Sequence, residues 1–91
     1  MNRLEQDRAI IDELDARFVQ LFEQRFHVIK DIIDYKVENH LPILDSGREE
    51  EIVERNSNLV EDEDLQKYFR KLYSYMIEVS REYQEEVLKE K

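Results

Sequence analysis

The sequence has no cysteine, and its 91 residues include only one glycine and one proline. Without cysteine, disulfide frameworks, thiolate zinc sites and thiol nucleophiles are excluded. With so few turn-forming residues, the chain can hardly build the many tight turns of a β-sandwich or β-barrel. The composition therefore excludes an all-β fold and predicts an all-α fold, with residues 1–91 forming a single domain.

Long hydrophobic runs and a surplus of basic charge are also missing. No stretch approaches the roughly 20 consecutive apolar residues of a membrane-spanning helix, and the first ten residues lack the apolar core of a secretory signal. The 14 Lys and Arg residues are outnumbered by 23 Asp and Glu residues, which gives a net charge of −9. Because phosphates need a basic surplus, this balance argues against nucleic-acid binding. We therefore expect a cytoplasmic chain that binds neither nucleic acid nor membrane.

The single proline and the single glycine predict one main corner. Pro42 and Gly47 both fall within residues 39–47, so the chain turns there. Before this corner, residues 4–38 repeat apolar side chains at helical spacing, which predicts a helix of about 35 residues and roughly 50 Å. Because this helix is too long for a compact chain of this size, we expect it to bury its surplus apolar face in an intertwined homodimer.

Two shorter helices are predicted after the corner. The first covers residues 48–57, with Asp45 or Ser46 as its N-cap. An acidic turn at 61–64 leads into a third helix over residues 65–88. Its apolar side chains recur along one stripe, which consists of Leu65, Phe69, Leu72, Met76, Val79, Tyr83 and Val87. We therefore expect three helices in each chain.

Basic residues interrupt the apolar stripe of the first predicted helix. Alternating steps of four and three follow a seam of the coiled-coil kind, made up of Leu4, Arg8, Ile11, Asp15, Phe18, Phe22, Arg25, Ile29, Ile32 and Lys36. One basic residue could extend from the edge of the seam or pair with Asp15. Three are harder to explain, because an unpaired cation in an apolar groove costs several kcal/mol. They make sense mainly if a small dianionic ligand enters the groove.

The spacing of these basic residues divides them into two groups. Arg25 and Lys36 are 11 residues, or about 16 Å, apart, so their side chains can meet around a small molecule. Arg8 lies 17 residues, or about 25 Å, before Arg25 and cannot reach the same site within one helix. If two copies pair antiparallel about an axis near residues 18–22, Arg8 of one chain lies beside residues 29–32 of the other. We therefore expect a site shared across a homodimer interface.

These residues resemble the signature of the all-helical chorismate mutases. The first helix is similar to their pattern L-x3-R-x2-I-D-x2-D…R…K in Leu4, Arg8, Ile11, Asp12, Asp15, Arg25 and Lys36. The family's second signature is a Pro-containing corner followed by D-x2-R-E, which resembles Pro42, Asp45, Arg48 and Glu49 here. Its third signature, I-x2-S-x3-Q, resembles Ile77, Ser80 and Gln84. Three signatures in this order, covering all but the last few residues, form a specific resemblance.

The resemblance implies a stand-alone chorismate mutase, which rearranges chorismate to prephenate on the way to phenylalanine and tyrosine without a cofactor or a metal. From the sequence itself we expect no fused dehydratase, dehydrogenase or regulatory domain. An enzyme for such a reaction holds a reactive conformer and stabilises the negative charge that develops on the breaking ether oxygen. Fixed cationic and hydrogen-bond donors, as in the seam described above, suit this task.

The resemblance also implies a role for each motif residue. Arg25 and the partner chain's Arg8 would bind the two substrate carboxylates, since guanidinium groups match carboxylates in pairs of hydrogen bonds. Lys36 and Gln84 would donate to the ether oxygen. Glu49 would accept from the ring hydroxyl, assisted by Asp45 and Arg48. Ser80 would support a carboxylate. The apolar wall would consist of Ile32, Ile52 and Ile77.

Structural roles remain open for several of these residues. Asp45 could serve only as an N-cap, and Ser46-x-x-Glu49 is also a capping-box pattern. Ser80 and Gln84 would ordinarily be interpreted as polar residues at the edge of a helix. The two histidines lack a ligand spacing and the acidic run lacks the alternating ligands of a calcium loop, so we expect no metal site.

Two other functions compete with the mutase. An isochorismate-pyruvate lyase on the same scaffold would use a similar arginine and lysine pocket, although the D-x2-R-E signature argues against it. In the second alternative, a non-enzymatic acidic helical module, the seam would only hold two chains together. That alternative leaves Arg8, Arg25 and Lys36 without an explanation.

Overall fold

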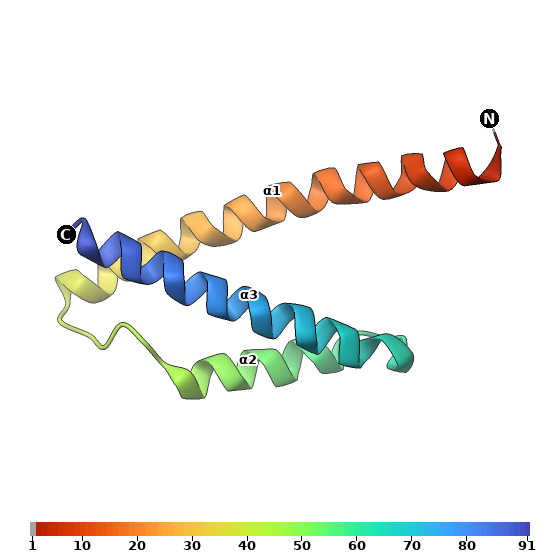
Figure 1. The fold of residues 1–91 in the computed structure, drawn as a ribbon. Coiled ribbons are helices and arrows are strands. Elements are labelled where there is room, and N and C mark those ends of the chain that lie inside the picture. Colours follow the sequence, from red (N-terminus) through yellow and green to blue (C-terminus); the bar gives the residue numbers. More distant parts are fainter. Residues whose placement is uncertain (1) are drawn as a thin grey trace.

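The structure, a computed structural model, describes residues 2–91 as three helices joined by two short connections (Figure 1). The helices are α1 (Arg3–Glu38), α2 (Ser46–Asn58) and α3 (Glu63–Lys89), and these residues include no strand. The predicted all-α fold with a long first helix is confirmed. Each helix boundary lies within two residues of the predicted one.

Acidic side chains begin the two later helices. Asp45, and not Ser46, caps α2 by accepting a hydrogen bond of 2.9 Å from the backbone N–H of Arg48. Asp62 caps α3, so Glu63 and Asp64 form its first turn and the acidic turn is shorter than predicted. Negative charge is favourable there because it complements the positive end of the helix dipole.

A left-handed residue ends α1 abruptly. His40 has a φ of 56°, and two backbone hydrogen bonds close the helix, from Leu41 N to Lys36 O at 2.9 Å and from His40 N to Val37 O at 3.3 Å. This pair of bonds is the Schellman motif, which reverses the chain directly after a helix. The corner therefore starts one turn after Lys36 and stays close to that side chain.

The third helix holds the other two together. α3 packs against both α1 and α2, whereas in residues 2–91 the Cα atoms of α1 and α2 remain more than 8 Å apart. The buried apolar side chains are few, and the set consists of Phe26, Ile33, Ile52, Ile77 and Val87. Because α1 and α2 meet only through α3, the space between them is left to side chains and to a cavity.

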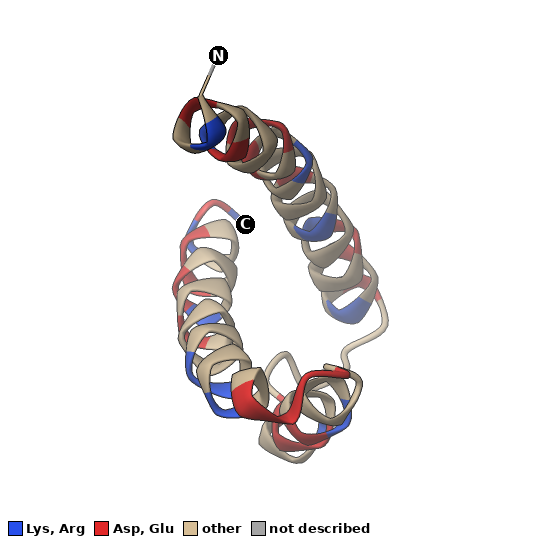
Figure 2. Cartoon of the chain, turned by 90° about the vertical axis from the view of Figure 1, so that its right-hand side faces the viewer, with Lys and Arg blue, Asp and Glu red and all other residues tan. Residues whose placement is uncertain are grey.

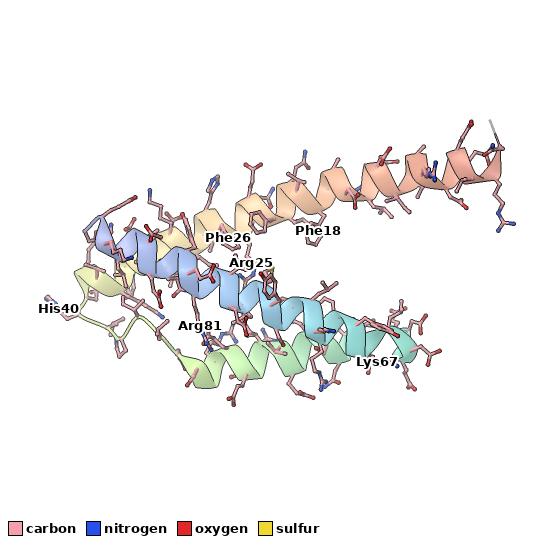
Figure 3. All side chains as sticks on the ribbon, viewed as in Figure 1. Phe18, Arg25, Phe26, His40, Lys67 and Arg81 are labelled. Atoms are coloured by element: carbon pink, nitrogen blue, oxygen red, sulfur yellow. The ribbon has the colours of Figure 1, made fainter. Side chains whose placement is uncertain are left out.

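No other part of residues 2–91 covers the N-terminal half of α1. α1 and α3 lie close together near their C-terminal ends and diverge toward the N terminus of α1, and the molecule is 56 Å long (Figure 1). Phe18 is 67% exposed on this diverging part of α1 (Figure 3). The predicted stripe of α3 is therefore covered only in part: Val87 is buried, but Leu72 is 73% exposed.

Charged residues occur along all three helices (Figure 2). Their distribution leaves no helix of the described residues long and apolar enough to cross a membrane. Among these charges, the cationic side chains that face the space between α1 and α2 are the ones that define the site.

Candidate functional site

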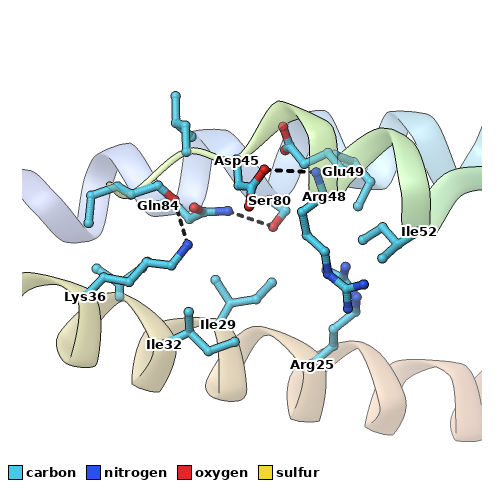
Figure 4. A pocket seen from close by; sticks show the side chains of 14 residues that line it. Arg25, Ile29, Ile32, Lys36, Asp45, Arg48, Glu49, Ile52, Ser80 and Gln84 are labelled. Atoms are coloured by element: carbon cyan, nitrogen blue, oxygen red, sulfur yellow. Dashed lines mark hydrogen bonds between the residues drawn. The ribbon is translucent and has the colours of Figure 1, made fainter. Parts of the chain in front are cut away.

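A cavity of about 130 Å³ lies between the C-terminal half of α1, the corner, and the facing sides of α2 and α3 (Figure 4). The structure brings ten of the eleven predicted site residues to its wall, namely Arg25, Ile32, Lys36, Asp45, Arg48, Glu49, Ile52, Ile77, Ser80 and Gln84. Four further apolar residues complete the wall, which are Ile29, Ile33, Ile43 and Leu44. The cavity exists because α3 keeps α1 and α2 apart.

Arg25 brings a half-buried cation to this cavity from α1. Its Nη1 atom is buried and has no hydrogen-bond partner in the part of the chain that the structure describes. The guanidinium carbon lies 5.8 Å from the centre of the Tyr73 ring, which offers a weak cation–π contact and no counter-charge. A buried N–H donor of a cation that has no partner costs free energy, so an anion that accepted from it in the cavity would remove this cost.

Lys36 brings a second cation from the last turn of α1. Its Nζ donates a hydrogen bond of 3.0 Å to the backbone carbonyl of Ile43 in the corner. An ammonium group has three N–H donors, so this contact fixes the side chain and leaves donors for a ligand. The negative end of the α1 dipole also favours a cation at this position.

Two polar residues of α3 line the cavity one turn apart. Ser80 is buried, and Gln84 is half-buried and donates a hydrogen bond of 3.3 Å to the hydroxyl oxygen of Ser80 (Figure 4). Interpreting this pair as polar edge residues is therefore wrong for Ser80. The pair offers an amide and a hydroxyl to the same cavity that Arg25 and Lys36 reach from α1.

The start of α2 adds three charged residues. Asp45 both caps the helix and lines the cavity, so its structural role coexists with a place at the site. Arg48 is exposed and lies 3.7 Å from Glu51, a pair that surface exposure makes weak. Because Asp45 is the N-cap and the Glu49 carboxylate accepts from Arg81, the capping box predicted by Ser46-x-x-Glu49 does not form.

Both carboxylate oxygens of Glu49 are held by Arg81 of α3. The Arg81 Nε lies 3.0 and 2.9 Å from the two oxygens, and Nη2 lies 2.8 Å from Oε1. These hydrogen bonds, followed by the negative charge of Glu49 and that of nearby Glu78, raise the pKa of Arg81 above its ordinary value. Glu49 is thus an anion whose charge is already balanced from outside the cavity.

The cavity wall is therefore more cationic than the chain as a whole. Its charged residues are Arg25, Lys36, Arg48, Asp45 and Glu49. Of the two acids, Glu49 is paired with Arg81 and Asp45 accepts from the backbone of α2. In a chain of net charge −9, this local excess of cations favours a small anionic ligand.

Residues 7–85 match the sequence profile of chorismate mutase type II. The chain belongs to this family. It is also similar to a bifunctional chorismate mutase/prephenate dehydratase from Buchnera aphidicola subsp. Schizaphis graminum (strain Sg), with 32% identity over 74 residues. Those residues are 80% of this chain but only 19% of that relative, so the chain spans about a fifth of its length. No solved structure gives a significant match.

The chorismate mutase type II match includes Arg8, the one predicted site residue outside the cavity. Arg8 is exposed on the N-terminal half of α1, about 25 Å along the helix from Arg25. The expectation that Arg8 cannot reach the site of its own chain agrees with this geometry. Whether it reaches the site of a second copy stays a prediction.

Two contacts of this chorismate mutase type II chain were missed from the sequence. Arg81 joins Glu49 across 32 residues, and no fixed spacing announces an ion pair between two helices. The hydrogen bond from Lys36 to Ile43 depends on the turn at His40, whose backbone is left-handed. Because non-glycine residues rarely adopt this conformation, the sequence did not indicate it. Ile33, which is fully buried and lines the cavity, was also not predicted. The only signal for it in the sequence was its position directly after the predicted site residue Ile32.

Proposed function

We propose that the chain is a chorismate mutase, which rearranges chorismate to prephenate. The observation that carries this proposal is the cationic cavity, in which the buried Nη1 of Arg25 has no partner among the described residues. Chorismate is a dianion, so its carboxylates supply the missing counter-charge. In the rearrangement the ether C–O bond breaks, a C–C bond forms, and no proton is transferred. The reaction therefore needs no general acid or base.

Arg25 and Lys36 contact different groups of the substrate. Arg25 binds one carboxylate and the partner's Arg8 the other, while Arg48, whose cation lines the same cavity, assists at the start of α2. Lys36 donates to the ether oxygen, where negative charge develops as the C–O bond breaks. Because its Nζ is already fixed by Ile43, it loses little freedom on reaching the transition state.

The α2 and α3 residues complete the proposed substrate contacts. Gln84 donates its second N–H to the ether oxygen, and Ser80 supports a carboxylate. Glu49 accepts from the ring hydroxyl, assisted by Asp45. The substrate ring lies against the apolar wall of Ile32, Ile52 and Ile77. Fixed donors and walls of this kind hold the reactive conformer and lower the barrier by positioning.

A second copy of the chain is proposed to complete the site. An apolar groove of about 350 Å³ lies between α1 and α3 and includes Phe18, Phe22, Leu72 and Met76. Exposed apolar patches of this kind are typical of interfaces. The N-terminal half of a partner's α1 fits this need, because its own apolar residues are exposed, and it would bring the partner's Arg8 to the cavity. We propose that this dimer works in the cytoplasm, on the path to phenylalanine and tyrosine.

The direct test is to mix the purified chain with chorismate and follow the loss of its ultraviolet absorption and the formation of prephenate. A parallel assay with isochorismate measures the release of pyruvate. Formation of prephenate at a rate well above the uncatalysed one is the expected result. Pyruvate release without prephenate would instead support the lyase, and the absence of turnover of both compounds would support the non-enzymatic module.

The Gln84→Glu variant is expected to make the reaction depend on pH. A side-chain amide donates at any ordinary pH, whereas a carboxyl must be protonated to donate. From a reference value of about 4.3, burial and the anionic substrate raise the pKa of the introduced carboxyl, and Lys36 lowers it. As pH rises and the carboxylate forms, it repels the charge on the ether oxygen, so activity falls.

The measurement is kcat/KM of the native chain and of the Gln84→Glu variant from acid to neutral pH, with helicity recorded at each point. In the native chain, the contact of Gln84 with the ether oxygen should add almost no pH dependence to kcat/KM, because the amide does not titrate and no proton moves in the reaction. If the two profiles run parallel, Gln84 does not face the ether oxygen.

A further inference from the structure

Glu49 separates the cavity from a groove on the outer surface of α2 and α3. It lines both spaces, whereas Arg81 lines only the outer groove. Arg81 lies where α3 faces α2 (Figure 3). Of the two residues that line both spaces, Glu49 and Ile77, only Glu49 is hydrogen-bonded to Arg81, so its carboxylate is the direct link from Arg81 to a ligand in the cavity.

The contact between these two residues fixes the carboxylate in orientation as well as in charge. Three N–H···O contacts of 2.8 to 3.0 Å join the planar guanidinium to both oxygens. The Glu49 side chain is 16% exposed, and that of Arg81 is 44% exposed. A paired geometry of this kind specifies direction, which a single charge contact does not.

Opposing charges surround Glu49 on its two sides. On the cavity side lie three cations, Arg25, Lys36 and Arg48, with Asp45 as the other acid. On the outer side lie Glu50, Glu54 and Glu78, which repel the carboxylate, and the cation Arg81, which attracts it. Without Arg81, the groove lining would hold only acids, of which Glu54 is paired with Arg70, and the remaining Glu50 and Glu78 would drive the Glu49 carboxylate toward the cavity cations.

We propose that Arg81 is a positioning residue, which holds the Glu49 carboxylate at the cavity wall and so keeps Lys36 and Arg48 free for the substrate. The proposal rests on the chorismate mutase activity proposed above. In the absence of Arg81, Glu49 competes with the substrate for the cations of its own site. Because this competition occurs in the free enzyme, it raises KM more than it lowers kcat.

The chain contains a matched control for this contact. Arg70 of α3 pairs with Glu54 of α2 at 3.1 Å, and the Arg70 side chain is 45% exposed, as Arg81 is. Both pairs join the same two helices, but neither Arg70 nor Glu54 lines the cavity. If the pairs served only to hold α2 against α3, their removal would have similar effects.

The experiment compares the steady-state kinetics of the native chain with those of the Arg81→Ala and Arg70→Ala variants on chorismate. Arg81→Ala is expected to raise KM about tenfold and to lower kcat by less than about threefold, while Arg70→Ala leaves both near the native values. The Arg81→Lys variant keeps the charge and should recover part of the loss in KM. Melting temperature and helicity are measured for each variant, and Arg81→Gln replaces Arg81→Ala if the latter loses helicity.

A double-mutant cycle with Glu49→Gln tests whether Arg81 acts through Glu49. A neutral amide is not drawn to the cavity cations, so adding Arg81→Ala to Glu49→Gln should change KM by less than about twofold. The proposal is overturned if Arg81→Ala behaves like Arg70→Ala, or if its effect on KM is unchanged in the Glu49→Gln background. In both cases the native activity stands, whereas an inactive native chain would overturn the proposed function itself.

Discussion

Replacing Arg25 by methionine is expected to remove most of the activity and to stabilise the folded chain. We expect kcat/KM for chorismate to fall about a hundredfold or more, as for the loss of a preorganised charge contact worth about 3 kcal/mol. The free energy of unfolding should rise by about 1 kcal/mol, because the buried Nη1 has no partner in residues 2–91 and an apolar side chain of similar length has no such cost. Stability and activity therefore move in opposite directions.

The measurements are kcat/KM and urea unfolding of the native chain and the variant at one protein concentration. Lys36→Ala is the comparison, because it should also reduce kcat/KM about a hundredfold but gives up the hydrogen bond to Ile43, so no gain in stability is expected. If Arg25→Met kept near-normal kcat/KM, the guanidinium would not contact the substrate. A loss of stability would show that Arg25 serves the fold.

The cavity residues were predictable because most of their spacings are local. Arg25, Ile32 and Lys36 share one face of α1 at helical intervals, and Ser80 and Gln84 are one turn apart on α3. A helix fixes the direction of each side chain relative to the others, so a motif within it already describes a surface. The motif on α2 starts at its N-cap, which fixes that helix in the same way.

Contacts between helices were not predictable in this way. The bond between Arg81 and Glu49 depends on how α3 lies across α2, and the exposure of Leu72 depends on where α1 leaves α3. Neither angle is recorded in the spacing of residues along one helix. The left-handed His40 is a further case, since the turn was expected from proline and glycine but is made by a histidine.

Arg8 depends both on spacing within one helix and on packing between helices. Its motif is local to α1 and was recognised in the sequence, yet its proposed function requires a second chain. Within one chain, Arg8 is exposed and outside the cavity. A rigid helix does not bend back over about 25 Å, so Arg8 either acts across an interface or does not act at the site at all.

Mixing two inactive variants is expected to restore activity if Arg8 acts across the interface. Arg8→Ala and Lys36→Ala homodimers should each be nearly inactive. Unfolded and refolded together in equal amounts, about half of the dimers should contain one chain of each kind. In such a dimer, one site has Lys36 from its own chain and the partner's Arg8, both intact. The other site lacks both, so the mixture should recover about a quarter of the native activity.

The matched control mixes Arg25→Ala with Lys36→Ala. Arg25 and Lys36 line the same cavity from the same helix, so every site in every dimer keeps one lesion, and no activity should return. Sedimentation or light scattering before and after mixing establishes that dimers form in both cases. If Arg8 served the site of its own chain, the first mixture would behave like this control, because each site would again carry a lesion. Recovery of activity in the first mixture alone therefore assigns Arg8 to the partner's site. If neither mixture recovers activity, Arg8 does not act at that site.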